Sequence, residues 1–374
     1  MENSLLKLKK WGFNLFLAFA GLAVGLLLAE FCIRIFLPQT TYGGGLSYSD
    51  EAVFDLKANF TGDFSHPDYA YTVHTDENRL RLTWNPDDPI PDLRILVLGD
   101  SFAFGMGVND DQTIASSISK QLHQWGIQAR VYNAGVPSYN LGEIRCKYER
   151  IKDLIHPDIV VVTTVYNDFE ATVGDCKSIY WGKKFLDQEK ELKDIEPKLW
   201  SRAYPYIRDL ALGNSQLMVF LVKQSLNFMI KMGLRDSFVG VLKAYNPDFH
   251  QYAKDRVDNV RPVLTDLHKT IQKDGTFDIF AYIPGVLEVD DNLWNSSVKL
   301  EKKPLLRDFP HRHLLSAARE AGFPIIMDPV SDPDNLETLR KSYFQIDSHL
   351  NAKGNDFWGK LVAQKIREHP APPP

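Results

Sequence analysis

The chain has 374 residues, of which 44% are hydrophobic, 12% aromatic and 24% charged, and its formal net charge is -5 at pH 7. This composition excludes a disordered chain, and the length allows one large domain or two smaller ones. The negative charge, together with a sequence that has no RNA-binding or zinc-finger motif, argues against a nucleic-acid partner.

The first feature along the chain is an uncharged apolar segment, Trp11–Ala29. As a helix it would span roughly 28 Å, which is close to the thickness of a bilayer core. Lys7, Lys9 and Lys10 precede it, and positive charge before a span favours a cytoplasmic N-terminus. We therefore predict that residues 1–37 form a cytoplasmic N-terminus and a transmembrane signal anchor, with the rest of the chain outside the cytoplasm. A cleaved signal peptide is the alternative, which the length of the segment and the lack of a small-x-small site disfavour.

Residues 38–91 are rich in Gly, Asp, Pro and Tyr and contain short alternating pieces such as Tyr69–Thr75, "YAYTVHT". They predict an irregular N-terminal extension, or a small hairpin, that packs against the main body. This extension indicates no functional site. At the other end of the chain, the proline-rich residues 369–374 predict a disordered tail.

From residue 92 onwards, strands and helices alternate regularly. Helical periodicity follows the first two strands, at Asp110–Gly126 and Leu141–Ile155. The alternation predicts a three-layer, doubly wound α/β domain over residues 92–368, with a five-stranded parallel sheet and a ligand site beyond the carboxyl ends of its strands. The five short apolar runs typical of strands are Arg94–Gly99, Ala129–Gly135, Asp158–Asp168, Phe277–Pro284 and Phe323–Asp328.

The long interval between the third and fourth strands, residues 176–275, predicts a mainly helical insertion. Within it, the helix candidate Gln216–Met232 carries Lys223, Asn227 and Lys231 at a spacing of four, opposite a broad apolar arc. The favoured interpretation is a helix packed on the insertion's own core. The alternative is a lid or membrane-surface helix whose lysines face lipid head groups.

Few residues are available for disulfide or metal chemistry. Cys32 lies beside the apolar segment, where it is expected to act as a small hydrophobic residue. Cys146 and Cys176 flank one predicted strand, so they can pair in an oxidising compartment or remain two free thiols. His311 and His313 lie at i and i+2 with no acidic or thiol cluster beside them, and we expect no metal site there.

Ser101 directly follows the first strand, at the start of the turn toward a helix, where a serine is either a helix cap or a nucleophile. A serine hydroxyl becomes a nucleophile only if a base takes its proton. His349, in "QIDSHLNAKG" near the C-terminus, is the candidate base. Asp347 lies two residues earlier, so its carboxylate can reach one ring nitrogen of His349 while the other nitrogen faces outward.

Four segments resemble the conserved blocks of the SGNH, or GDSL-like, hydrolase family and occur in the family's order: "GDSF", "NAGVPSYN", "VYND" and "DSHLN". The resemblance makes Ser101 the nucleophile and completes a catalytic triad with Asp347 and His349. It also implies an oxyanion hole formed by the backbone N–H groups of Ser101 and Gly135 and by the side-chain amide of Asn167. Donors fixed around a developing negative oxygen are worth about 2.7–4 kcal/mol each when removed.

The resemblance covers residues 94–168 and 277–361 and leaves the extension and the insertion unexplained. The third block departs from the family pattern, because Val165 stands where the family commonly has glycine. By analogy with the family, Asp100 serves the turn and is not the acid of the triad.

These features predict a membrane-anchored, extracytoplasmic serine esterase that cleaves short-chain O-acyl esters without a cofactor or metal. The resemblance and the predicted location favour acylated cell-envelope or extracellular glycans as substrates. Two alternatives stay open. One is an O-acyltransferase that uses the same acyl-enzyme and is supplied by a membrane acyl-transport partner, and the other is a catalytically silent glycan-binding or assembly protein.

Overall fold

A computed structural model describes residues 2–37, 46–47, 55–66, 68–86, 91–174, 176, 215–231, 241–300 and 304–369. The chain divides into two compact units. One contains the helices α1 (Glu2–Phe36) and α7 (Gln216–Lys231), and the other contains the sheet and the helices around it. The helix predicted at 216–232 is therefore present.

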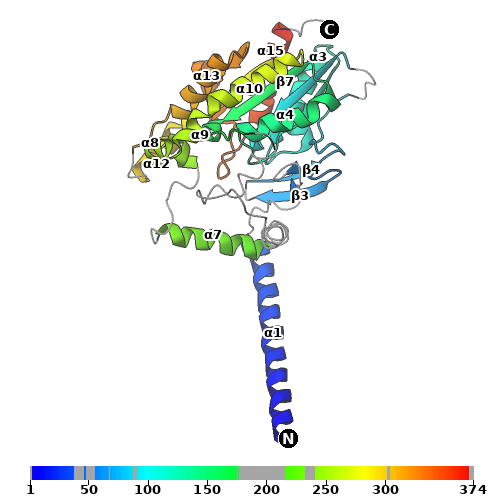
Figure 1. Cartoon of the computed structure of the whole chain (residues 1–374), viewed down its shortest axis with the longest axis vertical. Helices are drawn as coiled ribbons and strands as arrows, with labels where there is room; N and C mark the ends of the chain where they lie inside the picture. Colours follow the sequence, from blue (N-terminus) through cyan, green and yellow to red (C-terminus); the bar gives the residue numbers. More distant parts are fainter. Residues whose placement is uncertain are drawn as a thin grey trace. The chain divides into compact units, whose positions relative to one another are not determined.

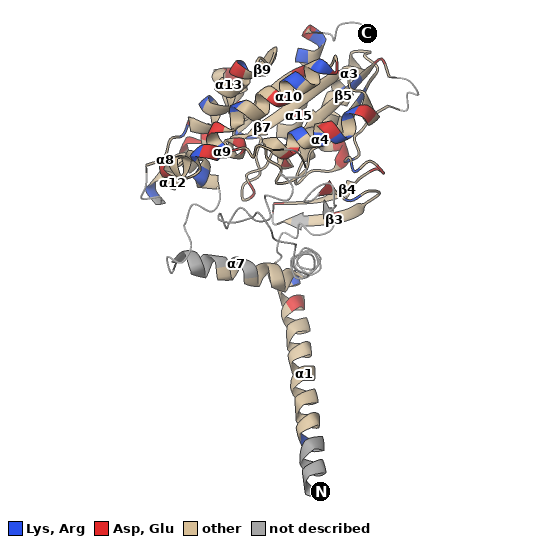
Figure 2. Ribbon diagram, in the orientation of Figure 1, with Lys and Arg blue, Asp and Glu red and all other residues tan. Residues whose placement is uncertain are grey.

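Helix α1 contains a candidate membrane span, Lys10–Phe36, with a mean hydropathy of 2.3. Its 27 residues extend about 40 Å, which exceeds the roughly 30 Å of a bilayer core. Figure 2 shows that few charged residues interrupt it. By length and composition the helix can serve as a membrane anchor or as a signal sequence.

The first turn of α7 is held by α1. The Glu30 carboxylate accepts hydrogen bonds from the Ser215 hydroxyl at 2.8 Å and from the backbone N–H groups of Gln216 at 3.0 Å and Leu217 at 2.8 Å. A carboxylate at this position satisfies N–H groups that have no partner inside the helix. The interpretation of this helix as part of a separate core within the insertion does not anticipate this contact.

The larger unit is built on a five-stranded sheet whose order is β6-β5-β7-β8-β9, and every neighbouring pair is parallel. This confirms the predicted doubly wound sheet. Strand β5 pairs with β6 on one side and with β7 on the other, so the chain changes direction across the sheet at this strand. The strands are β5 (Leu93–Leu98), β6 (Ala129–Asn133), β7 (Ile159–Val165), β8 (Phe277–Ile283) and β9 (Ile325–Met327).

Helices cover both faces of the sheet, as Figure 1 shows for α4 and α10 on one face. Along β5, Ile95 and Val97 belong to one buried cluster and Leu96 and Leu98 to the other, because successive strand residues point to opposite faces. This explains why the strands are continuously apolar. The covering helices are α3 (Ile114–Gln124) and α15 (Ala352–Glu368) on one face, and α4 (Leu141–Ile155), α10 (Val260–Lys273) and α13 (Phe309–Ala321) on the other.

Helix α10 lies within the residues expected to form the insertion, yet it belongs to the layer that covers the sheet. Its apolar stripe, which includes Val260, Leu264 and Ile271, is fully buried in the same cluster as α4 and β8. The shorter elements that complete the unit are α2 (Ser101–Phe104), η1 (Asp110–Gln112), η2 (Tyr166–Asp168), η3 (Val241–Tyr245), α8 (Pro247–Tyr252), α9 (Lys254–Asp258), α11 (Val286–Val289), α12 (Asp291–Leu300), η4 (Pro329–Ser331) and α14 (Pro333–Arg340).

The N-terminal extension forms two small antiparallel pairs, and it packs on the main body through buried charges. The pairs are β1 (Leu46–Ser47) with β2 (Asp55–Leu56), and β3 (Thr61–His66) with β4 (Tyr69–His74). The buried Asp55 carboxylate forms ion pairs with Lys147 at 2.9 Å and with Arg150 at 2.9 Å, both on α4. Such buried carboxylate pairs fix where the extension docks.

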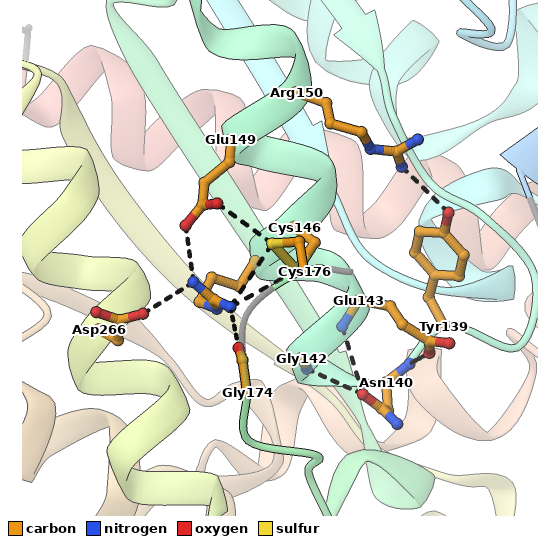
Figure 3. Close-up of a disulfide and its surroundings, with 11 residues drawn as sticks. Tyr139, Asn140, Gly142, Glu143, Cys146, Glu149, Arg150, Gly174, Cys176 and Asp266 are labelled. Atoms are coloured by element: carbon orange, nitrogen blue, oxygen red, sulfur yellow. Dashed lines mark hydrogen bonds and ion pairs between the residues drawn. A yellow bond between two sulfur atoms is a disulfide. The ribbon is translucent and has the colours of Figure 1, made fainter. Parts of the chain in front are cut away.

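Cys146 on α4 and Cys176 form a disulfide (Figure 3). The pairing that the sequence left open is thereby present. It ties the chain just after β7 and η2 back to α4, beside Glu149. Cys32 on α1 is a free, exposed cysteine.

Candidate functional site

Ser101 is positioned at the carboxyl edge of the sheet by a very tight turn. β5 ends at Leu98, and α2 begins at Ser101 two residues beyond Gly99. A Cβ at Gly99 would lie 2.0 Å from the Thr163 hydroxyl of β7, so only glycine allows the chain to turn here. Asp100 is the N-cap of α2, accepting the Phe102 N–H at 2.9 Å. The cap is therefore Asp100, and the hydroxyl of Ser101 is left for another role.

His349 lies beside Ser101, although 248 residues separate them in the sequence. Its Nε2 is 2.8 Å from the Ser101 Oγ. The loop between α14 and α15 that carries it is closed like a narrow hairpin, because Phe344 N–H donates to the His349 carbonyl at 3.0 Å and Asn351 N–H donates to the Ser342 carbonyl at 2.8 Å. The imidazole thus projects from a fixed loop onto the N-terminus of α2.

Asp347 occupies the other side of the imidazole, with its Oδ1 hydrogen-bonded to His349 Nδ1. Its second oxygen, Oδ2, accepts a hydrogen bond from the Tyr69 hydroxyl of β4. The Asp68 carboxylate accepts the backbone N–H groups of Ile346 at 2.6 Å and Asp347 at 2.7 Å. The extension therefore contributes two residues to the surroundings of Asp347, although its sequence indicated no site.

Gly135 lies against the backbone of α2. A Cβ there would be 2.2 Å from the Phe104 nitrogen and 2.6 Å from the Ala103 carbonyl carbon, so glycine is required for this approach. The Gly135 N–H donates to the Asn133 side-chain oxygen at 3.0 Å, and the Asn133 amide donates to the Ala103 carbonyl at 3.0 Å. Asn133, at the end of β6, thus joins the Gly135 loop to the Ser101 helix.

Asn167 lies in η2, directly after β7, at the same edge of the sheet. Its side-chain oxygen is buried without a hydrogen-bond partner within the described residues. Burial raises the pKa of Asp100, while hydrogen bonds from Phe102 and Asn167 and the charge of His349 act against this rise. The amide of Asn167 therefore lies within reach of Asp100, beside Ser101.

The loop that follows α2 is held from beneath by the fully buried Arg81 of the extension. Its guanidinium donates to the carbonyl oxygens of Phe104 at 2.8 Å, Gly105 at 2.7 Å and Val108 at 2.6 Å, and its Nε donates to Asp110 at 2.8 Å. The planar guanidinium supplies a donor to three carbonyl groups of this loop. The Phe104 carbonyl also accepts the Asn133 amide at 3.3 Å, and the Gly105 carbonyl also accepts the Val108 N–H at 3.3 Å. Nothing in the local sequence around Arg81 signals this role.

The structure thus brings together the residues that the sequence proposed: Ser101, Asp347, His349, Gly135 and Asn167. In such an arrangement, the imidazole can take the proton of the hydroxyl while the carboxylate orients the ring and stabilises its charged form. His311 and His313, the histidine pair considered with respect to a metal site, make other contacts: the His311 ring bonds to Asp328 at 2.8 Å, and the His313 ring stacks on Phe309. Within the described residues, no group of three or more His, Cys, Asp or Glu side chains is arranged to hold a metal ion.

No family model matches the chain, and no curated protein matches it. Similar solved structures include a lipase/acylhydrolase from Enterococcus faecalis, with 13% identity and a TM-score of 0.40 over 74% of this chain and 96% of that one. An acetyl xylan esterase from Geobacillus stearothermophilus has 13% identity and a TM-score of 0.38 over 75% and 96%. The psychrotrophic esterase EstA from Pseudoalteromonas sp. has 12% identity and a TM-score of 0.36 over 74% and 98%. The functional interpretation therefore rests on this chain's own geometry.

Proposed function

We propose that the chain is an SGNH-type serine esterase. The observation that carries this proposal is the 2.8 Å approach of His349 Nε2 to the Ser101 Oγ, with Asp347 on the other ring nitrogen. The unassisted hydroxyl would be a poor nucleophile, and this contact supplies the base that it needs.

The proposed reaction has two steps. In the first, Ser101 Oγ bonds to the ester carbonyl carbon while His349 accepts its proton, and His349 then protonates the leaving alkoxide as the carbon–oxygen bond breaks. In the second, His349 takes a proton from water as the water oxygen bonds to the acyl carbon, and His349 then returns the proton to the Ser101 Oγ as the bond between Oγ and the acyl carbon breaks and the carboxylic acid leaves. The N–H groups of Ser101 and Gly135 and the amide of Asn167 are the proposed donors to the oxyanion.

To donate to the oxyanion, the Gly135 N–H must first leave the acceptor that it has in the structure. Its N–H donates to Asn133 in the structure. An oxyanion beside Ser101 would share or replace that bond, and the charge-assisted bond to an oxyanion is the stronger one.

The proposed substrates are short-chain O-acyl esters, carried on cell-envelope or extracellular glycans. We further propose that α1 anchors the protein with its N-terminus in the cytoplasm and the sheet unit outside. The disulfide between Cys146 and Cys176 supports this location, because disulfides persist in oxidising compartments and are rare in the cytosol. The three lysines that precede the span support the same orientation.

The test uses the full chain in detergent with p-nitrophenyl acetate and longer p-nitrophenyl esters. We expect turnover that is fastest on the short esters and that falls by at least about a thousandfold in Ser101→Ala. Ser316→Ala, at an exposed serine of α13, is the control and retains the wild-type rate. Equal rates for wild type and Ser101→Ala would refute the mechanism.

The proposed topology is tested separately. A reporter enzyme that works only outside the cytoplasm is fused after Pro374, and we expect it to be active in intact cells. The fusion protein should also stay in the membrane fraction at its uncleaved mass. Activity only in lysed cells would refute the orientation, and a soluble, shortened product would refute the anchor.

A further inference from the structure

Two consecutive residues of the extension, Asp68 and Tyr69, hold the segment that carries Asp347. The Tyr69 hydroxyl donates to Asp347 Oδ2, which is the oxygen that His349 does not use. The Asp68 carboxylate accepts the N–H groups of Ile346 and Asp347. Both the side chain and the backbone of Asp347 are thus fixed from the start of β4 and the residue before it.

We propose that Tyr69 is a positioning residue for the proposed triad and that its hydroxyl keeps the Asp347 carboxylate aimed at His349. This inference rests on the proposed function, because it assigns Tyr69 a role through His349 and Ser101. A carboxylate that loses the hydrogen bond to one of its oxygens rotates more easily about its Cβ–Cγ bond. A hydrogen bond at each oxygen removes this freedom and stabilises the ionised form.

A phenol suits this role. It is neutral throughout the physiological range, with an ordinary pKa near 10, so it donates to the carboxylate without adding a charge that would compete with the imidazolium. A lysine or arginine at this point would neutralise Asp347 and weaken its effect on His349.

The ring of Tyr69 is held independently of its hydroxyl. The ring centroid lies 4.7 Å from that of Phe344 and 5.5 Å from that of Tyr71, and the residue is only 9% exposed. These contacts do not involve the oxygen, so Tyr69→Phe retains them and removes only the donor. The substitution therefore separates positioning from packing.

The chain offers a matched control in Tyr148. Its hydroxyl donates to the Asp274 carboxylate at 3.0 Å, so Tyr148→Phe also removes one phenol-to-aspartate hydrogen bond. Asp274 precedes β8, whereas Ser101 follows β5, and these positions lie at opposite edges of a parallel sheet. Tyr148→Phe should lower stability without touching the triad.

The experiment measures kcat and KM on p-nitrophenyl acetate for the full chain in detergent, with the active fraction of each preparation counted by covalent labelling with a phosphonate ester. We expect Tyr69→Phe to lower kcat per active site by about 10- to 100-fold with KM within twofold of wild type, as for loss of a hydrogen bond to a charged group. Tyr148→Phe should keep both values. A kcat for Tyr69→Phe within twofold of wild type, or an equal loss in both variants, would overturn the proposal.

A second pair of variants decides the matter if Tyr69→Phe does not fold. Asp68→Ala removes the acceptor for the backbone of Asp347 and should lower kcat, whereas Asp68→Asn keeps an acceptor oxygen and should restore most of it. Equal kcat values for these two variants and wild type would then overturn the proposal. Ser101→Ala separates the two hypotheses. If it turns over ester as fast as wild type, the proposed function and this inference both fall. If it is inactive, the Tyr69→Phe result decides, or the Asp68 pair in its place.

Discussion

The Glu288 carboxyl group makes the stability of the protein depend on pH in a direction that can be worked out. The carboxylate accepts hydrogen bonds from the Tyr282 hydroxyl at 2.7 Å and from the Gly285 N–H at 2.6 Å. Burial raises its pKa to about 7, against an ordinary value of 4.5, although its hydrogen bonds and the charge of His311 oppose the rise. The folded protein therefore holds a proton at Glu288 that the unfolded chain releases between about pH 4.5 and pH 7.

The difference between the pKa of Glu288 in the folded protein and in the unfolded chain determines how stability changes with pH. Because the folded state binds more protons in this interval, its stabilisation by the proton is complete below about pH 4.5 and is lost as the pH rises through about 7. A rise of about 2.5 units corresponds to about 3 kcal/mol as an upper limit, at 1.36 kcal/mol per unit. The residue as a whole is partly exposed, so solvent screening reduces the figure.

Glu288→Gln tests the reasoning. Glutamine keeps an acceptor oxygen for Tyr282 or Gly285 and cannot ionise. The free energy of unfolding is measured by urea titration at pH 5, 6, 7 and 8 for both proteins under the same detergent conditions. We expect wild type to lose up to about 3 kcal/mol relative to the variant across this range. His311 and the other titrating groups are present in both proteins, so the difference reports Glu288 together with its electrostatic coupling to His311, and parallel pH curves would refute the argument.

Three further variants have defined outcomes. Asp55→Asn leaves the buried Lys147 without its carboxylate and should cost about 3–5 kcal/mol in urea unfolding, a loss that is absent if the pair is not formed in solution. Replacing both Cys146 and Cys176 by serine opens a loop with a sequence separation of 30 and should cost about 3–4 kcal/mol, and an unchanged midpoint would contradict the bond. Gly359→Ala places a Cβ 2.2 Å from a side chain of α3 and should cost about 1–3 kcal/mol, whereas a neutral effect would mean that α15 shifts freely.

The sheet and the placement of the candidate site residues at its edge were predictable because their signals are local. Each strand is a short apolar run, and Ser101, Gly135 and Asn167 each follow such a run directly, so the rule that parallel strands end at one edge brings them together. His349 and Asp347 could be assigned because they lie two residues apart and carry a recognisable block of sequence.

The contributions of the extension were not predictable in the same way. Tyr69 belongs to a piece whose alternation indicates only a half-buried strand, and 278 residues separate it from Asp347. Arg81 likewise has no local pattern that shows which carbonyl groups it meets. The end of the insertion is a different case, because Val260, Leu264 and Ile271 form a stripe that could have indicated a helix covering the sheet.

The contact between Tyr69 and Asp347 also joins an early and a late part of the growing chain. The strand that carries Tyr69 is synthesised before all five strands of the parallel sheet, whereas the loop that carries Asp347 follows the last of them, β9. During synthesis, Tyr69 can therefore order Asp347 only after every strand of the sheet has been made.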